Sequence, residues 1–279
     1  MSSYTVKERS KYYTGSIPTT KYESAHMLPT TASYSEEGHA AASNRSSTSL
    51  RVPVIFRRLH RLQQMDFELA AWQLTYLCLA PRRVYRNVYF HKQTKNTWAR
   101  DDPAILVLIG ACLCVSAILW GVVYSYRIKD MIGIALLMIA RDFLLSGVVV
   151  ATIIWLTANR LLLSPPSHST PADSKVEWAY AFDVHTNAFF PLYLTLYLAQ
   201  LFLLPVILKD NWICLWVGNT LYLAAFTQYT YGIYLGLTAL PFLVRSELLL
   251  SPLLPLFTAY VVSLLGFNVA QHVLQAYFR

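Results

Sequence analysis

Five long apolar stretches occupy the chain from residue 104 onward. The first, Ala104 to Tyr126, contains 23 residues without Asp, Glu, Lys or Arg. At about 1.5 Å of rise per residue, such a helix measures roughly 34 Å and crosses a hydrocarbon core of ~30 Å. The runs are too long and too uniformly apolar for a soluble α/β domain. We therefore predict an all-α polytopic membrane protein with five transmembrane helices, at about 104–126, 134–158, 188–208, 214–236 and 253–273.

The sequence before the first span divides into two parts. Residues 1–50 are rich in Ser, Thr and Tyr and poor in large aliphatic residues, which predicts a disordered cytosolic leader. Residues 51–103 form a basic amphipathic membrane-surface segment, followed by the five-span bundle at 104–279. Within this segment, residues 54–80 are predicted to form an amphipathic helix, either embedded in the membrane interface or docked on the bundle. Its apolar positions recur every three or four residues: Ile55, Leu59, Leu62, Met65, Leu69 and Trp72.

The positive charge of the chain is concentrated ahead of the first span. The net charge is +8, and residues 1–103 hold 15 Lys and Arg against 8 Asp and Glu. The remaining residues hold 8 against 7. Because basic residues near span ends favour the cytosolic side, we predict a cytosolic N-terminus and a lumenal C-terminus. A basic surface beside a membrane span also predicts contact with the lipid bilayer, particularly with anionic lipid.

Two polar and aromatic clusters lie on the predicted cytosolic side. The first, 82–102, mixes basic and aromatic residues as the headgroup belt of a membrane protein does. The same mixture stacks on single-stranded RNA, which we treat as the weaker interpretation. The second cluster begins at Trp178, just before the third predicted span. Together they form a candidate partner-binding surface: Arg82, Arg83, Arg86, Trp98, Arg100, Asp101, Asp102, Trp178, Asp183, His185 and Asn187.

Polar residues within the spans form a second group of candidates, chiefly Asp142 and Asn219. Charged groups inside a membrane are functional candidates by default, although Asp142 would lie nearer the interface if the second span began at residue 143. Adjacent residues on a helix point about 100° apart, so we expect Arg141 and Asp142 to be poor partners. Asp183 and His185 are two residues apart, unlike the four-residue spacing of common metal-ligand pairs. We therefore predict no catalytic residues, no metal site and no cofactor.

Four segments carry a resemblance to a known family: QQMDFELAAWQ, PRRVYRNVYFHKQTKNTWARDDPAILVL, VEWAYAFDVHTNAFFPL and WVGNTLYLA. They resemble the hallmark segments of the UNC-fifty (uncoordinated) family of Golgi membrane proteins, over about residues 57–276. His91 stands where an Arg is usual, and Asp142 matches an acid in the second span whereas Arg141 does not match the pattern. The resemblance implies five spans, a cytosolic N-terminus and residence in the Golgi membrane, with the ER and the inner nuclear membrane as other possible locations.

The resemblance also implies a function in membrane traffic. Members of the family are linked to vesicle transport, to recruitment of a large Golgi exchange factor for ARF GTPases, and to cargo receptors. They are also linked to surface delivery of cargo such as acetylcholine receptors. We thus predict a trafficking factor rather than an enzyme. The alternatives are a lipid transporter or scramblase with Asp142, Asn187 and Asn219 along a polar path, an RNA-binding membrane protein, and an intramembrane enzyme using Asp183 and His185.

Overall fold

The structure is a computed structural model that describes residues 65–86, 98–100, 102–163 and 175–278. The chain divides into a unit of residues 1–49 and a unit of residues 50–279, and every described residue belongs to the second. The predicted leader and the first part of the predicted amphipathic helix therefore lie outside the described residues. Within these residues the regular elements are helices, and the β-type pairing is confined to an isolated bridge between Leu163 and Leu243. The all-α prediction is confirmed to this extent.

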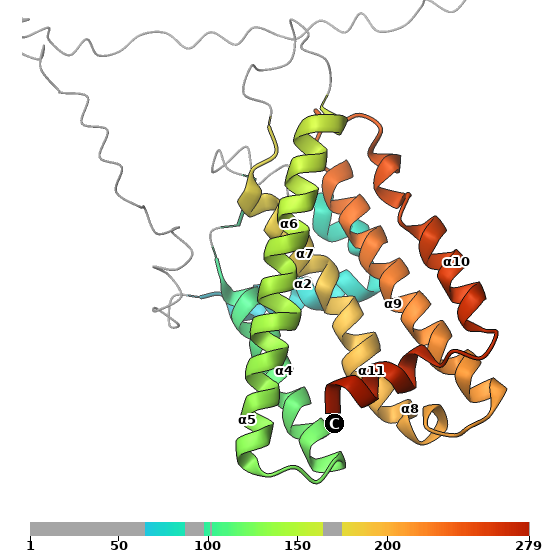
Figure 1. The fold of residues 1–279 in the computed structure, drawn as a ribbon. Helices are drawn as coiled ribbons and strands as arrows, with labels where there is room; N and C mark the ends of the chain where they lie inside the picture. Colours follow the sequence, from blue (N-terminus) through green and yellow to red (C-terminus); the bar gives the residue numbers. More distant parts are fainter. Residues whose placement is uncertain (1–64, 87–97, 101, 164–174, 279) are drawn as a thin grey trace, which may run out of the picture. The chain divides into compact units, whose positions relative to one another are not determined.

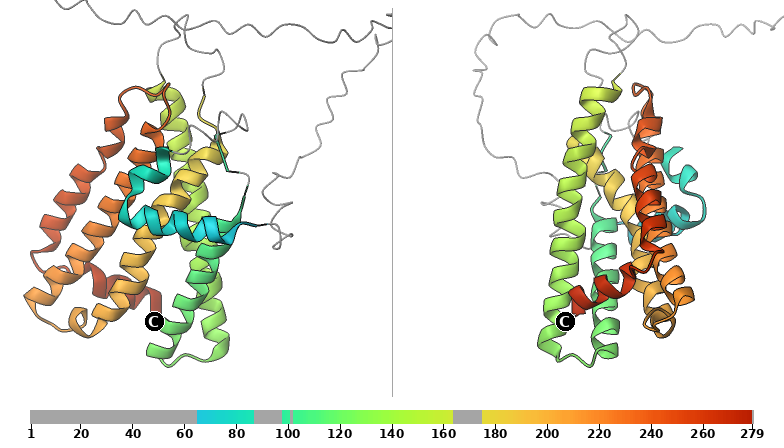
Figure 2. Two further views of the ribbon diagram at one scale, coloured as in Figure 1. Left: turned by 180° about the vertical axis from the view of Figure 1, so that it is seen from behind. Right: turned by 45° about the vertical axis from the view of Figure 1, so that its right-hand side comes forward.

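Long helices run side by side through the bundle (Figures 1 and 2). The first is α4 (Ala104–Val123), and the second is a continuous helix made of α5 (Ile128–Leu137), η2 (Met138–Leu145), α6 (Ser146–Thr157) and η3 (Ala158–Leu162). The third is made of α7 (Trp178–Tyr193), η4 (Leu194–Ala199) and α8 (Gln200–Ile207). The fourth is α9 (Trp212–Thr238), and in the last η5 (Ser246–Leu250) leads into α10 (Leu253–Ser263). Two shorter helices, α2 (Phe67–Leu79) and α11 (Val269–Phe278), cross them.

The bundle has two ends, which we name by a residue at each. The Tyr124 end contains the turn between α4 and α5 and the turn between α8 and α9. The Leu163 end contains the end of η3 and the connection from α9 to η5. At the Leu163 end the backbone N–H of Val244 donates to the carbonyl of Leu162 at 2.8 Å, which fastens the second helix to this connection.

Four helices in the described part are long and apolar enough to cross a membrane: Ala104–Val123, Ile128–Leu162, Trp178–Ile207 and Ser246–Ser263. The helix α9 contains 27 residues without a charged side chain, and at 1.5 Å per residue it measures about 40 Å. Its Tyr, Thr, Asn and Gln residues make it less apolar than the other four. The helix α9 is therefore long enough to cross a membrane, but its mean hydropathy is lower than that of the four candidate spans.

The last predicted span, 253–273, is not one continuous helix. The helix α10 ends at Ser263, and α11 begins at Val269 after a change of direction. Gly266 adopts a φ of +134°, a conformation that residues with a Cβ rarely tolerate. The third span also differs from its prediction, because the helix begins at Trp178 rather than at residue 188. Its first turns pack inside the bundle, where hydropathy alone gives no helix signal.

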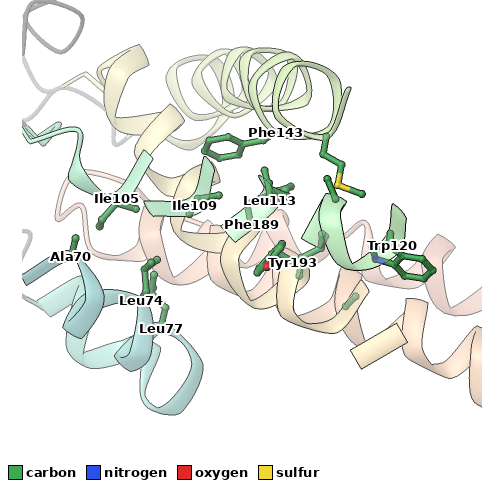
Figure 3. Packing of buried hydrophobic residues seen from close by; sticks show 14 of the residues in the cluster. Ala70, Leu74, Leu77, Ile105, Ile109, Leu113, Trp120, Phe143, Phe189 and Tyr193 are labelled. Atoms are coloured by element: carbon green, nitrogen blue, oxygen red, sulfur yellow. The ribbon is translucent and has the colours of Figure 1, made fainter. Parts of the chain in front are cut away.

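One face of α2 docks on the bundle. Ala70, Leu74 and Leu77 are buried, and they point toward Ile105 and Ile109 of α4 (Figure 3). The spacing of these three residues at i, i+4 and i+7 is that of one helix face. At the start of α2, the carboxylate of Asp66 accepts a hydrogen bond from the backbone N–H of Leu69 at 2.9 Å and so caps the helix.

The opposite face of α2 remains apolar and exposed. Leu69, Trp72 and Leu79 have exposed fractions of 54%, 55% and 77%. Leu69 and Trp72 belong to the face predicted to be apolar, and this face turns away from the bundle. Exposed apolar side chains on a helix that crosses a membrane bundle suit contact with lipid. The structure thus shows α2 docked on the bundle by one face, and the embedding of this segment in the membrane interface stays a prediction.

Small residues allow α7 and α9 to approach closely. A Cβ on Gly232 would lie 3.0 Å from that of Ala188, and one on Gly236 would lie 2.7 Å from both γ-carbons of Val184. Gly232 and Gly236 form a G-x-x-x-G pattern, which lets helix backbones meet inside membranes. This contact positions the N-terminal half of α7, which carries four of the candidate residues: Trp178, Asp183, His185 and Asn187.

Candidate functional site

The segment 98–100 lies along the start of α7 and is held by its acidic residues. The backbone N–H of Arg100 donates to Asp183 at 2.6 Å, and the guanidinium of Arg100 donates to the side-chain oxygen of Asn187 at 2.5 Å. Glu177 accepts from the backbone N–H of Trp98 at 3.3 Å. The Trp98 ring is buried, with edge contacts to two aromatic rings of the bundle. These contacts join a segment N-terminal to α4 with α7.

The predicted partner-binding surface therefore divides in two. Trp98, His185 and Asn187 are buried, so their predicted place on a docking surface is wrong. They are inside because each completes a hydrogen bond or ring contact between elements. The exposed members are Arg82, Arg83, Arg86 and Trp178, and the half-buried ones are Arg100, Asp102 and Asp183. Asp101 lies outside the described residues.

Asp102 supports the first long helix. Its side chain accepts from the backbone N–H of Ala104 at 3.0 Å and from that of Asp66 at 3.1 Å. The first bond satisfies a donor at the start of α4, and the second ties the start of α2 to the same point. Asp102 thus orients α2 relative to α4, and both of its oxygens are engaged.

His185 bridges three helical elements. Its Nε2 lies 3.3 Å from the carbonyl oxygen of Phe143, and its Nδ1 lies 2.7 Å from the hydroxyl of Tyr229. A carbonyl only accepts, so Nε2 donates its proton and Nδ1 accepts from Tyr229. The absence of a Cβ at Gly147 makes room for the ring, since a Cβ there would lie 2.7 Å from it. No hydrogen bond joins His185 to Asp183, whose carboxylate faces Arg100 instead.

Arg141 and Asp142 form an ion pair within the second helix, and the expectation that they are poor partners is wrong. The Nε of Arg141 lies 2.7 Å from Asp142 Oδ1. The other carboxylate oxygen accepts from the hydroxyls of Tyr197 at 2.8 Å and Tyr277 at 2.6 Å. The 100° rule holds for a straight α-helix, whereas η2 is π-helical, and the long Arg side chain folds back on its neighbour.

A cavity of about 380 Å³ lies beside this ion pair. Apolar side chains make up much of its wall, and the polar groups are those of the ion pair and of residues on η4, α8, α9 and α11. It is lined by Trp120, Met138, Arg141, Asp142, Leu196, Tyr197, Gln200, Tyr222, Phe226, Val269, Val273, Leu274, Tyr277 and Phe278. Pockets of this size and composition are typical of small-molecule sites.

Asn219 holds the junction between α10 and α11. Its side-chain nitrogen donates to the hydroxyl of Ser263 and to the carbonyl of Phe267, both at 2.9 Å. Its side-chain oxygen accepts from the backbone N–H of Val269 at 2.9 Å. The amide is buried and fully bonded, which makes it a structural connection between α9 and the last two helices.

Asp142, Asn187 and Asn219 thus belong to three separate networks. Asp142 bonds to tyrosines of η4 and α11, Asn187 to Arg100, and Asn219 to the α10–α11 junction. In the described part of the chain no hydrogen bond links one network to another. A continuous polar path through all three residues therefore has no support in the structure.

A second pocket, of about 210 Å³, lies between the α2 region and the helices α7 and α9. The Tyr85 hydroxyl is buried beside it and has no hydrogen-bond partner among the described residues. Burial raises the pKa of Tyr85, while Arg100 and Asn187 lie near enough to lower it, although no hydrogen bond of acceptable geometry joins Asn187 to the phenol. The phenol is therefore neutral.

Sequence reasoning missed the tyrosines that complete these networks. Tyr197, Tyr229 and Tyr277 lie in apolar or aromatic runs, where a tyrosine gives no sign of its partner. The G-x-x-x-G pattern of α9 was a readable signal for helix contact. In the described residues no group of three or more His, Cys, Asp or Glu side chains is arranged to hold a metal ion.

Comparison with known proteins gives a consistent result. A family model described as the UNC-50 family matches residues 55–278. A human protein named unc-50 homolog is 47% identical over 225 residues, which cover 80% of this chain and 85% of the relative. A protein of Schizosaccharomyces pombe named GMH1 homolog is 44% identical over 222 residues, which cover 79% and 94%. No solved structure shows significant similarity. The chain belongs to the UNC-50 family.

Proposed function

We propose that this chain is a Golgi membrane trafficking factor that docks a large cytosolic exchange factor for ARF GTPases. In this role it supports vesicle transport and the surface delivery of membrane cargo such as acetylcholine receptors. The proposal assigns the chain a docking function rather than a chemical reaction. Membership of the UNC-50 family and the long apolar helices support a membrane protein of this type.

The observation that carries the proposal is a basic surface on the helical segment 81–86. Arg82, Arg83 and Arg86 are exposed, whereas Val84 and Tyr85 between them are buried. The segment is therefore anchored from beneath while it presents three guanidinium groups. We call these three residues the arginine surface. Guanidinium groups on such a surface match acidic patches of a protein partner, because charge complementarity steers and orients association.

Two contacts hold the arginine surface in place. The Nε of Arg82 donates to the hydroxyl of Tyr231 on α9 at 3.1 Å. The guanidinium of Arg83 lies over the ring of Tyr76 on α2, 5.9 Å from its centroid. Side chains that are already oriented lose less conformational freedom on binding, which favours a docking surface over a solvated face.

The charge distribution supports a cytosolic Leu163 end. Exposed basic residues on this side of the bundle include the arginine surface together with Arg160, Lys175 and Arg245. The Tyr124 end carries Arg127, Lys129 and Lys209. Because basic residues are retained in the cytosol, the larger group favours the Leu163 end there. With α9 as a fifth crossing, the N-terminus is cytosolic and α11 lies on the lumenal side.

The test compares two triple variants in cells lacking the endogenous protein. In the first, Arg82, Arg83 and Arg86 are changed to Ala; in the second, the exposed Arg127, Lys129 and Lys209 are changed to Ala. Each variant removes three positive charges, and only the first removes them from the arginine surface. We expect the first to lower the amount of exchange factor captured with the membrane protein at least fivefold and the second to leave it unchanged.

Both triple variants must reach the Golgi membrane at normal abundance, which immunoblotting of isolated membranes measures. Equal capture by both variants and by the unchanged protein would show that the arginine surface is not the docking site. RNA captured in the same preparations is quantified as well. Loss of RNA rather than of exchange factor in the first variant would favour the RNA-binding interpretation.

A further inference from the structure

The cavity beside Asp142 has no part in the proposed docking function. It lies among η2, η4, α8, α9 and α11, whereas the arginine surface lies on the segment after α2. Trp120, near the last turn of α4, also lines it and places it in the half of the bundle toward the Tyr124 end. Its walls are formed by residues that are distant in the sequence, since the hydrogen-bonded residues Asp142 and Tyr277 are 135 positions apart.

The guanidinium of Arg141 lines this cavity and is accessible to a ligand. Its Nε is engaged by Asp142, and the guanidinium also lies close enough to the side chain of Tyr277 to interact with it. The side chain is 52% exposed, and its central carbon lies 4.8 Å from the centroid of the Tyr277 ring. An oriented guanidinium that is half exposed is suited to a phosphate, which accepts paired hydrogen bonds.

The carboxylate of Asp142 is committed to the protein. One oxygen accepts from Arg141 and the other accepts from Tyr197 and Tyr277, and the side chain is only 15% exposed. Asp142 therefore does not compete for a cationic group of a ligand. Its effect is to hold the Arg141 side chain in one orientation through the bond to Nε.

The rest of the cavity is apolar and open at the side. Met138 is buried at its wall, while Phe226 and Val273 are 41% and 40% exposed. Both exposed residues lie on helices of the bundle, Phe226 on α9 and Val273 on α11, so the opening is bordered by apolar side chains. A ligand that fits must present an anionic phosphate to Arg141 and an apolar part to these side chains. A phospholipid has both parts.

We propose that this cavity binds one phospholipid molecule from the leaflet at the Tyr124 end, with its phosphate on Arg141. The first part of an acyl chain then packs against Met138, Phe226 and Val273. The volume of about 380 Å³ accommodates the phosphate and its neighbouring atoms rather than whole acyl chains, which remain in the bilayer. The arrangement is a bound lipid site rather than a path across the membrane.

The test uses the full-length protein in mild detergent and native mass spectrometry. Three probes are added separately: dioleoyl phosphatidylcholine, dioleoylglycerol, which has the same chains without phosphate, and inorganic phosphate. We expect one phospholipid to remain bound and neither dioleoylglycerol nor inorganic phosphate to be retained. Equal retention of dioleoylglycerol would show an apolar site without phosphate recognition, and retention of phosphate alone would show an anion site; either result overturns the proposal.

Matched variants locate the binding site. Arg141→Gln and Arg141→Lys should each reduce phospholipid occupancy at least tenfold, because Lys cannot bond Asp142 through Nε while presenting two further nitrogens. Arg160→Gln removes an exposed arginine from the same continuous helix, away from the cavity, and should leave occupancy unchanged. Unchanged occupancy in Arg141→Gln overturns the proposal.

A further variant tests the site without changing Arg141, in case the arginine variants do not fold. Val273→Trp places a large ring at the open side of the cavity and leaves the Arg141–Asp142 pair in place. We expect it to lose phospholipid while keeping the thermal unfolding temperature of the unchanged protein in detergent alone. If Val273→Trp is stably folded and still retains one phospholipid per chain, the lipid binds elsewhere and the assignment fails.

Discussion

Polar side chains inside the bundle find their partners on other helices. His185 joins α7 to η2 and α9, and Asn219 joins α9 to both ends of the α10–α11 junction. Asp142 bonds to hydroxyls on η4 and α11. A buried polar atom without a partner costs about 1–3 kcal/mol, so these bonds favour one arrangement of the helices over others. At the residue scale, these polar side chains inside the bundle are therefore connections of the fold.

Replacement of Asn219 by Ala tests this role. Ala leaves the hydroxyl of Ser263, the carbonyl of Phe267 and the backbone N–H of Val269 without their shared partner. We expect the free energy of unfolding to fall by about 1–3 kcal/mol, with faster proteolysis between α10 and α11. Thermal unfolding and limited proteolysis of the purified protein measure the two effects.

Gln228→Ala is the control for Asn219→Ala. Gln228 lies on the same helix but is exposed, and its hydrogen bond in the structure is a single one from Thr195 at 3.2 Å. We expect this change to leave the unfolding temperature within the error of measurement. Equal destabilisation by the two substitutions would contradict the structural role of Asn219.

At the scale of elements, backbone approach and π-helical turns decide how the helices meet. The glycines of α9 bring it against α7, while η2 and η4 widen two of the long helices where Asp142 and Tyr197 meet. Pro191 lies in the last turn of α7, shortly before η4 begins at Leu194, and lacks the backbone N–H that donates a hydrogen bond in a regular helix. A local change of helix type accommodates such a residue within a membrane bundle.

Gly236→Ala tests the contact between α7 and α9. The added methyl group would lie 2.7 Å from both γ-carbons of Val184, closer than atoms of a packed core approach each other. We expect a loss of about 1–3 kcal/mol in the free energy of unfolding, because the two helices must separate or Val184 must leave its preferred rotamer. Chemical or thermal unfolding of the purified variant measures the loss.

Gly133→Ala serves as the matched control, since nothing lies within 4 Å of the position of its added methyl group. Alanine has the higher helix propensity, so this change should be neutral or stabilise α5 by about 0.5–1 kcal/mol. A comparable loss in both variants would show that the close approach of α7 and α9 does not contribute to stability.

At the scale of the whole molecule, the proposed orientation places the arginine surface in the cytosol and the phospholipid site toward the lumen. The sequon Asn44-Arg45-Ser46 and the arginine surface both come before all predicted spans, so the proposed orientation assigns both to the cytosol. We expect no sugar on Asn44, since N-glycosylation occurs in the lumen. We also expect protease added outside sealed Golgi vesicles to remove an N-terminal tag and to spare a C-terminal tag.

Mobility after glycosidase treatment and immunoblotting of the two tags measure these outcomes. The C-terminal tag becomes sensitive only when detergent opens the vesicles, which controls for a protease that fails to cut it. A glycosylated Asn44 or a protected N-terminal tag would reverse the orientation and remove the arginine surface from any cytosolic partner. Digestion of both tags would indicate an even number of crossings and exclude α9 as the fifth.

The sequence by itself determined the class of protein, because hydropathy and helix rise are local quantities. The apolar runs near 104–126 and 214–236 correspond closely to α4 and α9, and the four family segments identified the family. The basic character of residues 82–86 could also be read directly.

Only the tertiary structure decided which polar residues face a partner and which face the core. It placed His185 and Asn187 inside, paired Asp142 with Tyr277, and turned the predicted last span at Gly266. These outcomes depend on side chains that are distant in sequence and brought together by helix packing. The periodicity of one helix reveals its own faces but carries no information on which other helix will cover them.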